Sequence, residues 1–197
     1  MMNLIMMNLM SRFLIFVLCL LSSTVSWADG YGSLVIERSS VRFISKQMGV
    51  AVEGGFRRFT GQLDFDPAHP ETARARIDVD LASVDAGSAE ANAEVVGKDW
   101  FFVRQFPTAR FDMRRVKALG NGQYEVQGVL TIKNVSQEIV TRTSFHQADG
   151  LGFFTGNFII KRLAFGIGEG AWGDPGVVAD EVTVNFVLVA KPLPRQR

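Results

Sequence analysis

Few residues of this chain have the types and spacing that catalysis or metal binding requires. The only histidines are His69, in a turn between Asp66 and Pro70, and His146, at the end of a predicted strand. Neither has a second histidine or a cysteine nearby in the sequence, so neither is predicted to be a catalytic base or a metal ligand. The single cysteine, Cys19, lies in an apolar N-terminal segment. We therefore predict that the protein is not an enzyme, has no cofactor and holds no metal.

Two further features resemble functional sites. The first is a glycine cluster formed by Gly166, Gly168, Gly170 and Gly173. It does not open a helix after a parallel strand, as a dinucleotide-binding loop must, so we predict a surface loop. The second is Arg162, which continues an inward-facing alternation and needs an anionic or hydrogen-bonding partner if it is buried. Arg162 is predicted to contact a polar head group at a barrel mouth; alternatively, it pairs with a carboxylate of the protein, or the strand ends at Lys161.

The N-terminal segment is predicted to be an export signal. Arg12 is followed by an apolar run over 13–21 and by a small-residue cleavage site that ends at Ala28. The run is well short of the roughly 20 residues that a helix needs to cross a bilayer. Residues 1–28 are therefore predicted to be a signal peptide cleaved after Ala28. The mature chain, residues 29–197, is predicted to be one periplasmic domain.

The composition of the mature chain argues against a nucleic-acid partner. The whole sequence has 21 Lys and Arg and 20 Asp and Glu, and Arg12 is the only charged residue of the signal segment. The mature chain is therefore neutral, which gives no electrostatic reason to bind nucleic acid. Sixteen Phe against two Tyr indicate a dry interior, because a buried phenyl ring needs no hydrogen-bond partner.

Alternation of apolar and polar residues with a period of two dominates the mature chain, and it is clearest at Val182, Val184, Phe186 and Leu188. Strands are predicted over 34–45 with a break near Ser39, 50–56, 61–65, 73–81, 109–116, 124–133, 138–145, 154–161 and 182–188. Short turns join them, so neighbouring strands should pair antiparallel. Eight or nine such strands close into a barrel or stack as a sandwich. One short helix is predicted over 88–96, with Ser88 as its N-cap.

The interior of such a protein can hold a ligand. An eight-stranded barrel is wide enough either to be filled by side chains or to enclose one small molecule. The presumed inner faces carry the small residues Gly128, Gly156, Ala73 and Ala75, which are expected to leave space that their larger neighbours do not fill. This pattern favours a cavity over a filled core.

Five stretches together resemble the YceI-like family of bacterial export proteins. They are EGGFRRF at 53–59, GKDWF at 97–101, FPTARF at 106–111, VQGVLTIK at 126–133 and KRLAFGIG at 161–168. They occur in the family's order over nearly the whole mature chain. The resemblance implies an all-β fold, an eight-stranded antiparallel lipocalin-like barrel with one short helix. It also implies that a polyisoprenoid chain, or the tail of a quinone, lies in the central channel.

The stretches Lys46-Gln47-Met48 and GEGAW at 168–172 resemble a subgroup found beside membrane b-type cytochromes that handle quinones. This likeness implies a ubiquinone-like ligand. The predicted function is a periplasmic binding or carrier protein for a long-chain isoprenoid lipid, acting as a monomer or a homodimer. The alternatives are an adaptor with a filled barrel that docks a b-type cytochrome or another membrane partner, and a lipid-modifying enzyme. The predicted channel residues are Phe43, Phe56, Phe111, Phe158 and Phe186, and the predicted mouth residues are Arg162, Trp172 and Gln47.

Overall fold

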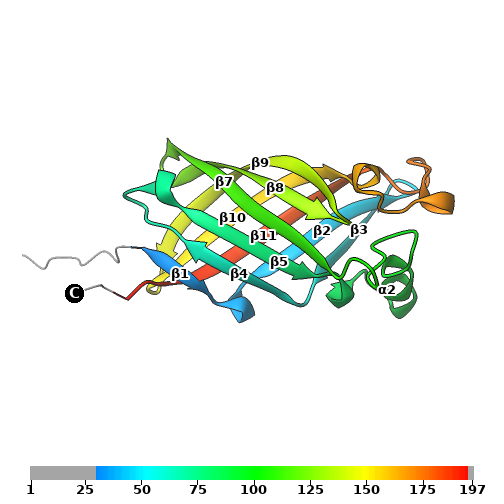
Figure 1. Ribbon diagram of the computed structural model, residues 1–197, viewed down its shortest axis with the longest axis horizontal. Coiled ribbons are helices and arrows are strands. Elements are labelled where there is room, and N and C mark those ends of the chain that lie inside the picture. The colour runs from blue at the N-terminus through cyan, green and yellow to red at the C-terminus, as the bar shows by residue number, and fades with distance from the viewer. Residues whose placement is uncertain (1–29, 195–197) are drawn as a thin grey trace, which may run out of the picture.

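The computed structural model describes residues 30–194, so the predicted signal peptide lies outside the described residues. Eleven strands in this range form one antiparallel sheet that curls into a long barrel (Figure 1). The strands are β1 (Tyr31–Leu34), β2 (Ser40–Gln47), β3 (Val50–Phe56), β4 (Phe59–Asp64), β5 (Arg74–Asp80), β6 (Val84–Asp85), β7 (Thr108–Gly120), β8 (Gln123–Ile132), β9 (Val135–Ala148), β10 (Leu151–Lys161) and β11 (Glu181–Pro192). The predicted all-β barrel is confirmed.

The eleven strands compare with nine ranges predicted from the alternation and with the eight strands that the family resemblance implies. β1 and β6 are additional short strands, and β3 and β4 are the two halves of one bent segment. The sheet order is β4-β5-β7-β8-β9-β10-β11-β2-β3-β6. β1 pairs with β11, and its Tyr31 also exchanges backbone hydrogen bonds of 2.7 and 3.0 Å with Phe65, just beyond β4. β1 therefore closes the barrel at the end where β11 ends (Figure 1).

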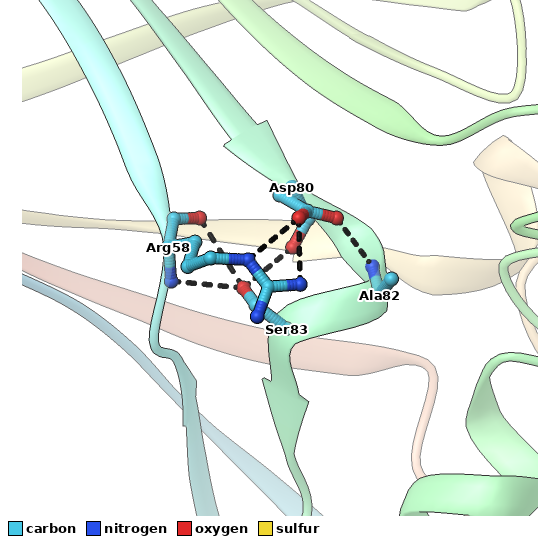
Figure 2. Close-up of polar contacts among 4 residues, drawn as sticks. All are labelled: Arg58, Asp80, Ala82 and Ser83. Carbon is cyan, nitrogen blue, oxygen red and sulfur yellow. Dashed lines mark hydrogen bonds and ion pairs between the residues drawn. The ribbon is translucent and has the colours of Figure 1, made fainter.

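The bend between β3 and β4 is fixed by a compact set of polar contacts (Figure 2). The buried Ser83 hydroxyl accepts from the backbone N–H of Arg58 (2.9 Å) and donates to the backbone oxygen of Asp80 (2.6 Å). The Asp80 carboxylate accepts from the Arg58 side chain (2.9 Å) and from the backbone N–H of Ala82 (2.9 Å). Because Asp80 caps the 3-10 turn Leu81–Ser83 in this way, β5 ends one residue before the predicted end.

The predicted helix is present as α2 (Ala89–Val95), and the Ser88 side chain accepts from the backbone N–H of Ala91 at 3.1 Å, as an N-cap does. Four further 3-10 turns are η1 (Ile36–Arg38), η2 (Pro70–Thr72), η4 (Arg162–Phe165) and η5 (Gly170–Trp172). η1 produces the break that was predicted near Ser39. No helix within residues 30–194 is long and apolar enough to cross a membrane.

Two apolar clusters lie at opposite ends of the barrel. At the end closed by β1, the Phe65 ring packs against Tyr124, Phe145 and Phe154 with ring centroids 5.0–5.3 Å apart. The other end carries α2 and the segment 162–180, drawn green and orange in Figure 1, and its cluster includes Leu81, Trp100, Phe165, Ile167 and Val178. The aromatic cluster seals the first end, whereas the second is built from loops and helical turns.

Candidate functional site

A cavity of about 270 Å³ runs through the barrel between these two clusters. Its lining extends along β11 from Val182 to Leu188, a length of about 20 Å of strand. The side chains of the lining that carry a nitrogen or oxygen atom are few: Ser45, Gln47, Trp100, Tyr124, Thr141, Thr143 and Arg162. A cavity of this volume and length is a narrow, apolar tunnel. Its shape suits one extended chain better than a compact ligand.

The predicted channel residues all line this tunnel: Phe43, Phe56, Phe111, Phe158 and Phe186. Each of the five is only half-buried although it points into the barrel. Inward-facing rings in a filled core would be buried by their neighbours. The partial exposure of these rings therefore shows that the barrel axis is open.

The tunnel stays open because three of these rings lie against the barrel wall, each over a glycine of a neighbouring strand. The pairs are Phe43 over Gly54, Phe111 over Gly128 and Phe186 over Gly156, and a Cβ at any of the three glycines would overlap the ring. The expectation that Gly128 and Gly156 leave unfilled space was wrong, because the rings occupy that space. Ala73 and Ala75 do border the cavity, as predicted.

The tunnel opens between the turn joining β2 and β3 and the helix α2. Of the described residues that line the cavity, Gln47 alone is exposed, and it is the last residue of β2. Ala91 and Val95 of α2 border the same end of the cavity and are half-buried. Gln47 therefore lies at the mouth, where it was predicted.

Arg162 is buried, with 1% of its surface exposed, and lies just past β10, which ends at Lys161. All five of its N–H groups donate to backbone oxygens, at distances of 2.6–3.1 Å: those of Ile167, Gly168, Trp172, Val178 and Ala179. Desolvation lowers the pKa of Arg162 from its ordinary value, and nearby Asp180 opposes this shift. No N–H group of Arg162 remains for a lipid head group, so the predicted head-group contact is not seen.

Of the two alternatives, the ion pair with a carboxylate is not seen, because the partners of Arg162 are backbone carbonyl groups. The other alternative is confirmed, since the strand ends at Lys161. Three of the five acceptor carbonyls belong to the glycine-rich segment that was predicted to be a loop, and those of Val178 and Ala179 lie beyond it. Gly168 has a φ of 72°, and a Cβ there would overlap the guanidinium, so a glycine is needed for this close approach. Arg162 therefore organises the segment 162–180 at the mouth end of the barrel.

Trp172 does not line the tunnel, contrary to its predicted place at the mouth. Its ring packs on Trp100 with centroids 5.6 Å apart, and its Nε1 donates to Glu94 of α2 at 2.8 Å.

Trp100 borders the cavity instead, and its buried Nε1 has no hydrogen-bond partner among the described residues. The same holds for the Thr143 hydroxyl. Leaving a buried donor without an acceptor costs about 1–3 kcal/mol of stability. A ligand oxygen that accepts a hydrogen bond from either atom would therefore be favoured.

Neither histidine lies on the tunnel lining. His146 stacks on Phe153 with ring centroids 5.0 Å apart, on the exposed side of the barrel wall. His69 is exposed, and its Nδ1 lies 2.8 Å from Asp66 Oδ2. Within residues 30–194, no group of three or more His, Cys, Asp or Glu side chains is placed to hold a metal ion.

The contact between His69 and Asp66 predicts a measurable titration. The Asp66 carboxylate accepts a hydrogen bond from the protonated His69 ring, which raises the pKa of His69 and lowers the pKa of Asp66. The small stabilisation from this pair is present while His69 is protonated and is lost as the pH rises through its raised pKa. Asp66→Asn should therefore lower the pKa of His69 in an NMR titration, while Asp64→Asn should leave it unchanged. An equal pKa in all three proteins would rule out the interaction.

Comparison with known proteins agrees with this geometry. Residues 33–190 match the model of the YceI-like domain. A UPF0312 protein from Azotobacter vinelandii is 30% identical over 110 residues, covering 55% of this chain and 57% of that protein. A UPF0312 protein from Vibrio cholerae is 31% identical over 108 residues, covering 54% of this chain and 57% of that protein. The matched region thus spans a little over half the length of these relatives.

Solved structures share the barrel. BcnA from Burkholderia cenocepacia superposes with a TM-score of 0.79 and 38% identity, covering 81% of this chain and 100% of that one. A polyisoprenoid binding domain from Saccharophagus degradans, implicated in plant cell wall breakdown, has the same fold with a TM-score of 0.65 and 18% identity, covering 83% of this chain and 98% of that one. The family model covers residues 33–190, most of the chain, and the solved structures share its barrel, so the chain belongs to the YceI-like domain family.

Proposed function

We propose that this protein binds a long-chain isoprenoid lipid in the tunnel and carries it through the periplasm. The narrow apolar tunnel, with its half-buried inward rings, is the observation that carries the proposal. The similar fold of the polyisoprenoid binding domain from Saccharophagus degradans supports it. The periplasmic location is supported by the signal-like composition of residues 1–28.

Apolar burial alone supplies enough affinity for such a ligand. Each isoprene unit has five carbons, and burial contributes about 0.8 kcal/mol per methylene, or about 4 kcal/mol per unit. Among the described residues, the tunnel lining includes no Asp, Glu or His, and these side chains are the commonest general acids and bases. The adaptor alternative assumed a barrel filled by its own side chains, and the cavity counts against it. The b-type cytochrome partner and the homodimer stay predictions.

We also propose that the ligand has an oxygen-bearing head, as a quinone or a polyprenyl derivative does, and that Trp100 Nε1 donates to it. Trp100→Phe keeps an aromatic ring and removes the donor. This variant should bind a short-tailed quinone about three- to tenfold more weakly, the value of one hydrogen bond. It should bind the matching hydrocarbon chain as the wild type does. Calorimetric titration with both ligands measures the difference, and an equal loss for both would assign Trp100 a packing role only.

The identity of the ligand is best tested on protein purified from its own periplasm. Native mass spectrometry, followed by organic extraction, should release one isoprenoid or quinone per protein. Protein that is reproducibly free of ligand, and that takes up no added isoprenoid, would refute the carrier function.

A further inference from the structure

An exposed apolar patch lies at the mouth of the tunnel. We call Met48, Val50 and Val177 the tip patch; their exposed fractions are 80%, 67% and 38%. The Met48 backbone N–H donates to Val177 O at 2.9 Å, and Gln47 forms a bridge with Val178. These contacts hold the turn between β2 and β3 against the segment 162–180, as Figure 1 shows at the end of the barrel that carries α2. The patch is therefore one surface built from two parts of the chain.

The stability of the fold does not explain why this turn carries a methionine at position 48. Met48 has a φ of 47°, a left-handed conformation that side chains other than Asn, Asp and Gly adopt at a cost. The three other two-residue hairpin turns have polar residues with positive φ: Asn121, Lys133 with Asn134, and Asp149. Among these turns, only the one between β2 and β3 carries a large apolar side chain, that of Met48, and 80% of this residue is exposed to water. A contact outside the chain would explain both the strained backbone and the exposure.

The position of the tip patch identifies that contact. Gln47, the exposed residue of the tunnel lining, directly precedes Met48. A long isoprenoid chain is almost insoluble in water, so it enters the tunnel most readily from an apolar phase. Lys46 is the only charged residue between Ser45 and Val52, whereas Asp174 and Asp180 lie three residues to either side of Val177 in the other part of the patch. A layer of zwitterionic head groups therefore suits the patch better than an acidic one.

We propose that the tip patch inserts into the surface layer of a lipid bilayer and places the tunnel mouth against it. The isoprenoid chain then passes between membrane and barrel without crossing water. This inference rests on the proposed function, because the cargo explains why the mouth faces a membrane. The insertion itself is a property of the exposed patch and can be measured without cargo.

The test measures binding to phosphatidylcholine vesicles, with and without phosphatidylglycerol, by flotation. Met48→Asn should reduce vesicle binding about tenfold, the change expected when one Met side chain no longer leaves water. The same variant should unfold at an equal or higher urea concentration than the wild type, because Asn suits the left-handed turn position better. Val50→Thr should weaken binding in the same direction. Val140→Thr is the matched control, since Val140 is 58% exposed but lies on the barrel wall, and it should bind vesicles as the wild type does.

The uptake of farnesol from aqueous solution separates the two proposals. If Met48→Asn takes up farnesol normally but receives isoprenoid from vesicles about tenfold more slowly, both proposals are supported. If no variant takes up farnesol while vesicle binding still depends on Met48, the docking surface stands and the carrier function fails. A wild type that binds neither kind of vesicle, or equal losses in Met48→Asn and Val140→Thr, would overturn the docking surface.

Discussion

Replacing Ala75 with phenylalanine should abolish isoprenoid uptake and leave the barrel folded. Ala75 lies on β5, borders the tunnel and pairs with Leu63 on the neighbouring strand β4. A benzyl group at this position would occupy the tunnel that the ligand needs. Displacing even one isoprene unit removes about 4 kcal/mol of apolar burial, so affinity should fall by more than about a hundredfold. The urea midpoint should stay equal or rise, because the new ring fills empty space.

Thr155→Phe provides the matched control for this experiment. Thr155 is exposed and lies between the inward residues Phe154 and Gly156 on β10, so its side chain points away from the tunnel. This variant gains the same ring on the outer surface and should take up isoprenoid normally. Normal uptake by Ala75→Phe would show that the ligand does not occupy the tunnel. A comparable loss in both variants would point to a general effect of the added ring.

Replacing Arg162 with methionine should lower the free energy of unfolding by about 3 kcal/mol or more. Five backbone oxygens accept from this guanidinium, and each hydrogen bond to a charged donor contributes roughly 1.5–3 kcal/mol. Methionine offers no donor, so these oxygens must find water or stay unpaired. Urea denaturation followed by circular dichroism measures the loss.

Arg162→Lys should fall between methionine and the wild type, because an ammonium group has three donors and lacks the planar fork of arginine. This second variant keeps the prediction testable if Arg162→Met does not fold. Arg42→Met is the control: the Arg42 side chain is 60% exposed, and its contact with Glu53 is 3.6 Å long. It should cost less than about 1 kcal/mol. Equal urea midpoints for Arg162→Met and Arg42→Met would show that Arg162 does not hold the segment together.

Ala75→Phe tests the tunnel and Arg162→Met tests the buried arginine, and these two features differ in how far the sequence could predict them. The inward position of Phe186 followed from the alternation on β11, because the side-chain period of a strand is a local property. The start of α2 followed from Ser88 for the same reason, since an N-cap contacts the first turn of its own helix. The family stretches then indicated how the strands close into a barrel.

Other features depend on contacts between segments that are distant in the chain. The partners of Arg162 could not be predicted, because they are carbonyl groups, and every residue has one. The identity of the aromatic residue beside the tunnel, Trp100 rather than Trp172, depends on how the segments after α2 and after β10 pack together.

The sequence by itself determined the strands, the helix, the apolar character of the interior and the family, because these depend on local periodicity and on residue types. Only the tertiary structure decided that the interior is a tunnel. Whether a phenylalanine fills the barrel axis or lies on the wall depends on which residue faces it on the next strand, as Gly156 faces Phe186. That pairing is a matter of strand register, and register is set when the sheet forms.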